Sequence, residues 1–215
     1  MTLRAFVPLL ALLGLTACAP PQATPAAPVL GGEAPASILV VPVVNRTVTL
    51  GAADACLTTL TRPVANRGYY VFPVYLVKRV LEEDGLADAN LVHGADPRRL
   101  GQLFGADAIL YVTLHRWDAK YAILTTQVEV ELEYVLKSGR TGEELWKDRQ
   151  LRTWTPQGGP TGQALGDLLG LALAATVAKA APDYLALARQ ANDAAFQVRR
   201  GGLPPGPYLT LPLGK

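Results

Sequence analysis

The chain has 215 residues, half of them hydrophobic, and its 20 basic residues against 18 acidic ones give a net charge of +2. Loss of Arg4 with an N-terminal signal lowers that charge to +1. So small a charge excludes the broad positive surface that non-specific nucleic-acid binding requires. The roughly 180 residues that follow position 35 are enough for one globular domain with its own core.

The N-terminus has the layout of a bacterial export signal. Arg4 precedes an uncharged apolar stretch, residues 5–15, that is too short for a settled membrane span. Leu15-Thr16-Ala17-Cys18 then resembles a lipobox, in which small residues precede a cysteine that receives lipid and becomes the new N-terminus. An ordinary secretory signal or an apolar anchor would leave the position of Cys18 unexplained. We expect residues 1–17 to be a lipoprotein signal peptide and Cys18 to be the lipidation site.

A tether is expected next. Residues 18–35 are rich in Pro, Ala and Gly, with Glu33 as the only charge, so they cannot form a packed element. Such a chain reaches about 3 Å per residue and holds the domain clear of the lipid headgroups. Position 19 is Ala, whereas an Asp there resembles an inner-membrane retention signal. We therefore expect attachment to the outer membrane on its periplasmic side, with surface exposure left open.

Strands and helices alternate in the first half of the domain, expected over residues 36–200. Pro42 removes a donor near the end of the first strand, and Pro63 is expected to bend the first helix. Asp96 and Pro97 have the residue types of a helix cap and first turn. The elements predicted here are a strand at 37–44, a helix at 53–67, a strand at 69–75, and short helices at 77–84 and 97–103.

Residues 104–114 (FGADAILYVTL) predict the central strand of the sheet. The run is continuously apolar and is entered through Gly105 and Asp107, which is typical of a strand buried on both faces. Strands separated by helices favour parallel pairing with right-handed crossovers. We expect this strand to join a parallel group before it to an antiparallel hairpin after it.

The hairpin is predicted from strict alternation. In residues 127–136 apolar side chains alternate with Glu129, Glu131 and Glu133, and a turn at 138–142 leads into a strand at 144–151. A turn centred on Arg140 places Glu133 opposite Lys147, Glu131 opposite Arg149 and Tyr134 opposite Trp146. We expect the glutamates to form a solvated face neutralised by these basic residues; an interaction stripe is the alternative.

A long apolar helix is predicted over residues 162–181. Its small residues recur every fourth position and form a ridge that allows close approach, at Gly162, Gly166, Gly170, Ala174 and Ala178. Asp167 and Lys179 leave too short an uncharged stretch for a membrane span, so we expect a packing face toward the sheet or toward a second copy of the chain. A further helix is expected at 183–198, and residues 201–215 form a proline- and glycine-rich tail.

The sequence offers little catalytic chemistry. His93 and His115 lie in different elements, and no spacing of His, Cys, Asp and Glu is typical of a metal site. Cys56 lies on the apolar face of the first helix and is interpreted as a small core residue. The glycines at 158–170 lack the Lys-Ser/Thr of a phosphate-binding loop. We expect no enzymatic activity, no cofactor and no metal. With Cys18 lipidated, an internal disulfide is excluded as well.

Four stretches resemble one family. They are LTTLTRPVANRGYYVFPV at 57–74, FGADAILYVTL at 104–114, TGEELW at 141–146 and GGLPPGPYL at 201–209. They are similar to a family of bacterial lipoproteins of unassigned function that includes a neisserial surface lipoprotein antigen. The resemblance implies a fold similar to the N-terminal domain of TolB and to the periplasmic domains of CsgG-like secretion lipoproteins. It further implies homodimers, a role in envelope transport and no catalytic residues.

These observations predict an α/β domain with a mixed sheet of about five strands in the order two-one-three-four-five. The first hypothesis for its function is a non-catalytic interaction or assembly component of an envelope transport or secretion complex. Its partners would be the membrane, through Cys18, and other envelope proteins, including a CsgG-like lipoprotein. The alternative is a ligand-binding accessory component of an ABC-type transport system, with its pocket at the end of the parallel strands where such sheets bind ligands.

Overall fold

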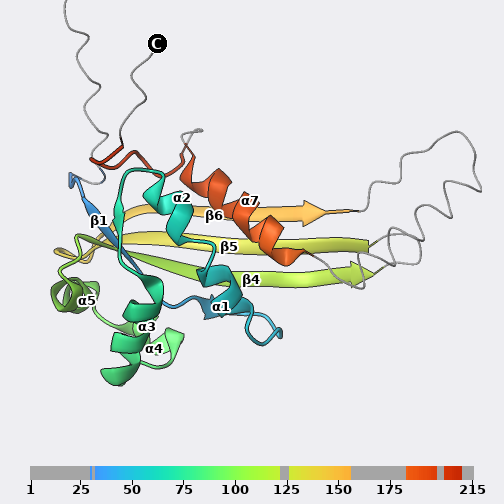
Figure 1. Ribbon diagram of the computed structural model, residues 1–215, viewed down its shortest axis with the longest axis horizontal. Helices are drawn as coiled ribbons and strands as arrows, with labels where there is room; N and C mark the ends of the chain where they lie inside the picture. The colour runs from blue at the N-terminus through green and yellow to red at the C-terminus, as the bar shows by residue number, and fades with distance from the viewer. Residues whose placement is uncertain (1–29, 31, 122–125, 156–182, 198–200, 210–215) are drawn as a thin grey trace, which may run out of the picture.

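The computed structural model describes residue 30 and residues 32–121, 126–155, 183–197 and 201–209. They form a mixed sheet in the order β3-β1-β4-β5-β6, with β2 also paired to β4 and with helices on both faces (Figure 1). The strands are β1 (Ser37–Val40), β2 (Val44–Asn45), β3 (Tyr70–Val71), β4 (Ala108–Tyr121), β5 (Thr126–Ser138) and β6 (Glu144–Trp154).

β4 is the central strand. It pairs in parallel with β1 and antiparallel with β5, and β5 pairs antiparallel with β6. Ile109, Leu110 and Val112 are completely buried, as expected for a strand covered on both faces. The predicted strand order and the change from parallel to antiparallel pairing are both confirmed. The strand begins later than predicted, because residues 97–104 belong to the preceding helix. It also ends later, at Tyr121.

Proline positions explain two differences from the predicted strands. Pro42 divides the first strand into β1 and β2, since it has no N–H to donate to β4. The sheet therefore has six strands where about five were expected. The second predicted strand is reduced to β3, because Pro73 is the N-cap of helix α3 (Val74–Glu83) rather than the end of a strand.

The predicted helix at 53–67 is two helices. Pro63 cannot donate to the carbonyl of Thr59, and its ring clashes with that carbonyl in a continuous helix. The chain therefore leaves helical pairing between α1 (Ala52–Leu57) and α2 (Thr61–Ala65). The Thr59 carbonyl accepts a hydrogen bond from Asn192 Nδ2 instead, at 3.2 Å. Proline here breaks the helix, where a bend was expected.

The remaining described helices are α4 (Ala89–Gly94), α5 (Pro97–Phe104) and α7 (Tyr184–Phe196). The predicted capping of α5 is confirmed, because the Asp96 side chain accepts from the Arg98 amide and Gly105 ends the helix at φ 66°. α4 was not predicted. The segment that contains its N-cap Asp88 and His93 was interpreted as a loop, whereas His93 lies on this helix.

The core lies on both faces of the sheet. Residues of α1, α2 and α7 pack on one face around Leu110, Leu132 and Tyr134. Residues of α3, α4 and α5 pack on the other face around Ile109 and Tyr111. The result is three layers, with helices above and below the sheet (Figure 1).

The predicted register of the hairpin is wrong by two residues. Glu133 pairs with Arg149 and Leu136 with Trp146, whereas Lys147 lies opposite Val135. Two residues more than predicted lie between the paired positions: one is in the turn, and the other is in a bulge beside Leu136. A shift of two keeps every side chain on its face. The Tyr134 and Trp146 rings therefore still meet, with centroids 6.2 Å apart.

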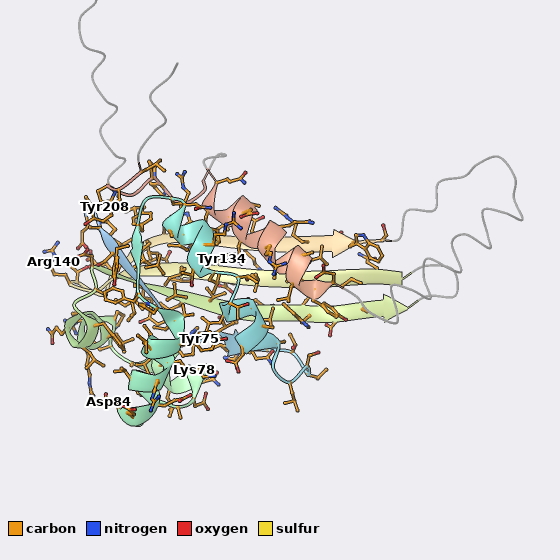
Figure 2. The ribbon with its side chains drawn as sticks, viewed as in Figure 1. Tyr75, Lys78, Asp84, Tyr134, Arg140 and Tyr208 are labelled. Atoms are coloured by element: carbon orange, nitrogen blue, oxygen red, sulfur yellow. The ribbon has the colours of Figure 1, made fainter. Side chains whose placement is uncertain are left out.

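Both ends of the described chain pack onto the domain. Leu30 and Leu203, from the expected tether and tail, are 7% and 0% exposed. Residues 201–209 pack against the connection between α2 and β3. There the Leu203 carbonyl accepts from Arg67 Nε at 3.1 Å and Nη2 at 2.9 Å. The Pro204 carbonyl accepts from the Tyr69 hydroxyl at 2.8 Å. Figure 2 shows Tyr208 and Arg140 at the same end of the molecule, with Tyr134 in its interior.

Candidate functional site

The residues singled out as sites in the sequence lie outside the described part of the chain. They are the lipidation residue Cys18 and the small-residue ridge Gly162, Gly166, Gly170, Ala174 and Ala178. The predicted long helix at 162–181 lies outside it as well. None of the described helices combines the length and the apolar composition needed to cross a bilayer.

Cys56 is confirmed as a core residue. Its side chain is fully buried on α1, and burial raises the pKa of the thiol to about 12. A thiol at this pKa is almost entirely protonated at neutral pH, so it is a poor nucleophile. Its neighbour Thr59 is also buried and donates a hydrogen bond to the Cys56 carbonyl at 2.6 Å.

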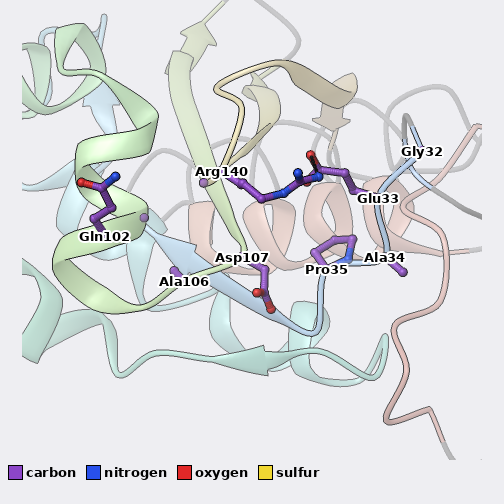
Figure 3. Close-up of a pocket in the computed structure, with 10 residues that line it drawn as sticks. Gly32, Glu33, Ala34, Pro35, Gln102, Ala106, Asp107 and Arg140 are labelled. Carbon is purple, nitrogen blue, oxygen red and sulfur yellow. Dashed lines mark hydrogen bonds and ion pairs between the residues drawn. The ribbon is translucent and has the colours of Figure 1, made fainter.

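A cavity of about 510 Å³ lies at the amino ends of the parallel strands β1 and β4. It is bounded by the segment before β1, by α5 and by the turn between β5 and β6. Figure 3 shows Glu33, Asp107, Gln102 and Arg140 around it. The pocket suggested for a ligand carrier was expected at the opposite, carboxyl ends of these strands, so that expectation is wrong for this cavity.

Two glycines shape the cavity wall where α5 meets the hairpin turn. A Cβ on Gly101 would lie 2.5 Å from the carbonyl oxygen of Gly139, and a Cβ on Gly139 would collide with the carbonyl oxygen of Ala106. The Gly139 amide donates to the Asp107 carbonyl at 2.7 Å. Glycine is thus required at both positions for the backbones to approach.

The carboxylates at this cavity hold the chain together. Asp107 Oδ2 accepts from the Ala36 amide at 3.0 Å, from the Ser37 amide at 2.9 Å and from Ser37 Oγ at 2.8 Å, which fastens the start of β1 to the start of β4. Glu33 accepts from Ser138 Oγ at 2.8 Å and pairs with Arg140 at 2.9 Å. Both side chains thus have a structural role in joining the segment before β1 to the sheet.

The carboxyl end of β1 is filled by aromatic packing. The His93 ring meets Tyr111 edge-on at 5.1 Å, and its Nε2 lies 3.0 Å from the Pro42 carbonyl oxygen. Burial lowers the pKa of His93, helped by the positive charges of Arg46 and Lys137. Burial, which outweighs the opposing effect of the Pro42 hydrogen bond, therefore favours the neutral imidazole.

The glutamate face of the hairpin is less solvated than expected. Glu129 and Glu131 are only 4% and 8% exposed. Arg116 contacts both, with Nη1 at 3.1 Å from Glu129 and Nε at 2.8 Å from Glu131, and Arg149 Nε lies 2.8 Å from the other oxygen of Glu131. His115 Nε2 lies 2.6 Å from Glu133. The expected neutralisation by Arg149 is confirmed, whereas Lys147 pairs with Glu144 instead.

The basic partners from β4 were missed because the central strand was expected to end at residue 114. It continues to Tyr121 through a bulge between Leu114 and Arg116, which brings Arg116 opposite Glu131. Apolar and polar residues alternate again from Trp117 to Tyr121, but the bulge shifts this alternation by one residue relative to Leu114, so the continuation of the strand was hard to see in the sequence. The cavity residue Glu33 was also missed, because its segment was interpreted as an unpacked tether.

The described side chains form a structural framework. Within residues 30–209, outside the undescribed gaps, no group of three or more His, Cys, Asp and Glu residues is placed to hold a metal ion. The charged groups described above connect strands, turns and chain ends through hydrogen bonds and ion pairs.

Comparison with known proteins identifies relatives of this chain. The family model "Putative lipoprotein GNA1162-like" matches residues 30–208. The curated protein "Putative lipoprotein NMB1124/NMB1162" of Neisseria meningitidis serogroup B is 38% identical over 112 residues, which cover 52% of this chain and 52% of that protein. The chain thus matches about half the length of this curated relative.

A solved structure agrees with the family match. The crystal structure of lipoprotein GNA1162 from Neisseria meningitidis is 32% identical, with a TM-score of 0.55, and the match covers 68% of this chain and 98% of that one. The matched segment begins at the buried Leu30 and extends past the buried Leu203, so it includes both packed ends of the domain. This chain therefore belongs to the GNA1162-like family of lipoproteins.

Proposed function

We propose that this protein is a non-catalytic interaction or assembly component of an envelope transport or secretion complex. It is attached through lipidated Cys18 to the periplasmic side of the outer membrane. The observation that carries the proposal is the combination of a lipoprotein family with a lipobox ending at Cys18. Ala at position 19 supports the outer membrane, and the tether reaches the packed domain at Leu30.

The exposed surface supports a role in protein interaction. Val48 and Leu50, on the loop before α1, are 93% and 96% exposed, and Tyr75 and Leu76 on α3 are also exposed. The loop is braced, because Asn45 Nδ2 donates to the Thr49 carbonyl at 2.9 Å. Apolar side chains held outward on an ordered loop are suited to insertion into a partner surface.

Anchoring is tested by replacing each cysteine separately. Cys18→Ala should abolish metabolic labelling with palmitate and release the protein from the membrane fraction, because a lipid chain supplies the membrane affinity. The matched control Cys56→Ala should keep both properties, since Cys56 is buried. A Cys18→Ala protein that is still labelled and still sediments with the outer membrane would rule out the anchor.

The interaction role is tested by cross-linking in intact cells. A photoreactive residue at position 48 should capture a component of a transport or secretion complex, such as a CsgG-like lipoprotein. The same residue at Asp148, on the opposite edge of the sheet, is the control for random collisions. Capture of the same proteins from both positions, or of none from position 48, would contradict the proposal.

We also propose that the protein forms a homodimer through the ridge at Gly162, Gly166, Gly170, Ala174 and Ala178. Gly166→Leu and Gly170→Leu overpack such a face and should shift the sedimentation coefficient toward the monomer, at a cost of about 1 to 3 kcal/mol. Unchanged sedimentation of both variants would show that the ridge is not an interface.

The second candidate is a ligand-binding accessory component of an ABC-type transport system. The cavity of about 510 Å³ at the amino ends of the strands favours it, since its size is in the range of small-molecule sites. Native mass spectrometry of the purified protein distinguishes the two proposals. A bound small molecule that is lost in Gln102→Ala would support the carrier, and an unliganded protein would support the assembly component.

A further inference from the structure

A second cavity, of about 360 Å³, lies in the groove between α2 and α7. These two helices lie side by side on one face of the sheet (Figure 1). The groove is lined by Thr58, Thr59, Arg62, Asn66, Arg189 and Asp193, together with Pro63. Arg62 lies in the Thr-Arg-Pro sequence at 61–63, within the first of the four stretches that resemble the family. The break between α1 and α2 gives Pro63 a structural role, but it does not involve the side chain of Arg62.

Two arginines in this groove have no side-chain partner in the described part of the chain. Arg62 and Arg189 make no side-chain hydrogen bond or ion pair with another described residue. Arg46 is the only other described arginine of this kind. The remaining described arginines, at positions 67, 79, 98, 99, 116, 140, 149 and 152, all bind a carboxylate or a carbonyl. Two of the three guanidinium groups that lack a partner among the described residues therefore share one groove.

The floor of the groove is ordered by hydrogen bonds of two threonine hydroxyls, of which Thr59 is buried. The Thr58 hydroxyl donates to the Ala55 carbonyl at 2.7 Å, and the Thr59 hydroxyl donates to Cys56 and accepts from Asn192. Both hydroxyl protons are thus occupied. Among the described residues, the lining groups left without a partner are the two guanidinium groups, the side-chain amide of Asn66 and the carboxylate of Asp193.

We propose that this groove binds a small molecule through a singly charged oxyanion placed between Arg62 and Arg189. Guanidinium groups bind phosphoryl and carboxylate oxygens through paired hydrogen bonds. The two guanidinium groups face the oxyanion, which leaves the carboxylate of Asp193 for a positively charged group. Asp193 lies one turn from Arg189 on α7, so it meets a neighbouring ammonium group of the same ligand. The ligand chemistry is therefore a zwitterion, such as the phosphoethanolamine group of a lipid or its free, water-soluble form.

Calorimetric titration of the full-length mature lipoprotein, in an uncharged detergent, tests this site. The probes are glycerophosphoethanolamine and dihexanoyl phosphatidylethanolamine, each up to about 10 mM. We expect at least one to bind, and Arg62→Gln and Arg189→Gln each to weaken binding by about tenfold or more. Equal affinities identify the free headgroup as the complete ligand, whereas tighter binding of the dihexanoyl compound identifies a lipid.

Two further variants separate a specific site from general attraction. Asp193→Asn should weaken binding of both zwitterions without weakening binding of inorganic phosphate, which has no ammonium group. Arg79→Gln removes an exposed arginine on α3, outside the groove, and should have no effect. No binding of either zwitterion, unchanged binding in both groove variants, or an equal loss in Arg79→Gln would overturn the proposal. All of these substitutions are on exposed side chains, so unchanged thermal melting is the check on folding.

Discussion

Asn192 joins three elements of the fold through one buried side chain. It is fully buried on α7. Its Oδ1 accepts from the Tyr134 hydroxyl of β5 at 2.7 Å, and its Nδ2 donates to Thr59, to the carbonyl at 3.2 Å and to Oγ1 at 2.7 Å. Asn192→Ala removes all three hydrogen bonds at once.

The energetic cost of Asn192→Ala comes from the buried polar groups that lose their hydrogen-bond partner. The Tyr134 hydroxyl and the Thr59 carbonyl would both be buried without a partner, because Pro63 has no N–H to offer that carbonyl. Each unsatisfied buried group costs about 1 to 3 kcal/mol. For two such groups we therefore expect Asn192→Ala to lower the free energy of unfolding by about 2 to 6 kcal/mol, before any loss of packing. Gln190→Ala, at an exposed position on the same helix, should change it by about 0.5 kcal/mol or less.

Urea denaturation monitored by tryptophan fluorescence measures these differences. Tyr134→Phe alone should cost about 1 to 2 kcal/mol, since it leaves Asn192 Oδ1 without its donor. The double variant should cost less than the sum of the single ones, with a coupling energy of about 0.5 to 3 kcal/mol. Strictly additive costs, or a cost of Asn192→Ala no larger than that of Gln190→Ala, would refute the role of Asn192.

Three further predictions concern buried groups. Cys56 should react with a thiol reagent only as the protein unfolds, and equal reaction rates with and without urea would contradict this. Because the folded pKa of its thiol, about 12, exceeds the unfolded value of 9.0, its contribution to stability is lost as the pH rises from about 9 toward 12. The folded pKa of His93 lies below 6.5, so stability should fall as pH drops through about 6.5 and below, and urea titrations of His93→Phe should show a weaker fall. Gly139→Ala should cost about 1 to 3 kcal/mol by overpacking, whereas Gly94→Ala, where nothing lies within 4 Å of the added Cβ, should be neutral in the same assay.

Side-chain alternation predicts which face of a strand a residue occupies more reliably than it predicts which residue lies opposite on the neighbouring strand. The apolar and charged faces of β5 and β6 were predicted correctly, because the pattern repeats every two residues and tolerates an even shift. The cross-strand pairs were predicted from an assumed turn length. One extra residue in the turn and one in the bulge shift the register by two residues. Arg149 still reaches Glu131 only because its side chain is long enough to bridge the diagonal.

The candidate sites were less accessible to sequence reasoning than the fold. The cavity near Asp107 and the groove with Arg62 and Arg189 each combine segments that are far apart in the chain, so no local spacing announces them. Pro63 predicted a bend in the helix, but its position also indicates which carbonyl loses its helical donor. A proline in a helical pattern indicates a carbonyl that needs another donor, and a buried Asn elsewhere in the chain is a natural source.

The packing of residues 201–209 bears on the order of folding. Arg67 and Leu203 are separated by 136 residues, and their hydrogen bonds close a contact between the first third and the last residues of the domain. Contacts of such long sequence separation form slowly, because a large loop must close before they are made. If the chain crosses a membrane N-terminus first, as the proposed lipoprotein signal requires, it cannot bury Leu203 until almost all of it has crossed. Native packing around Arg67 and Tyr69 would then be completed only after export, and the incomplete chain would expose that surface during transit.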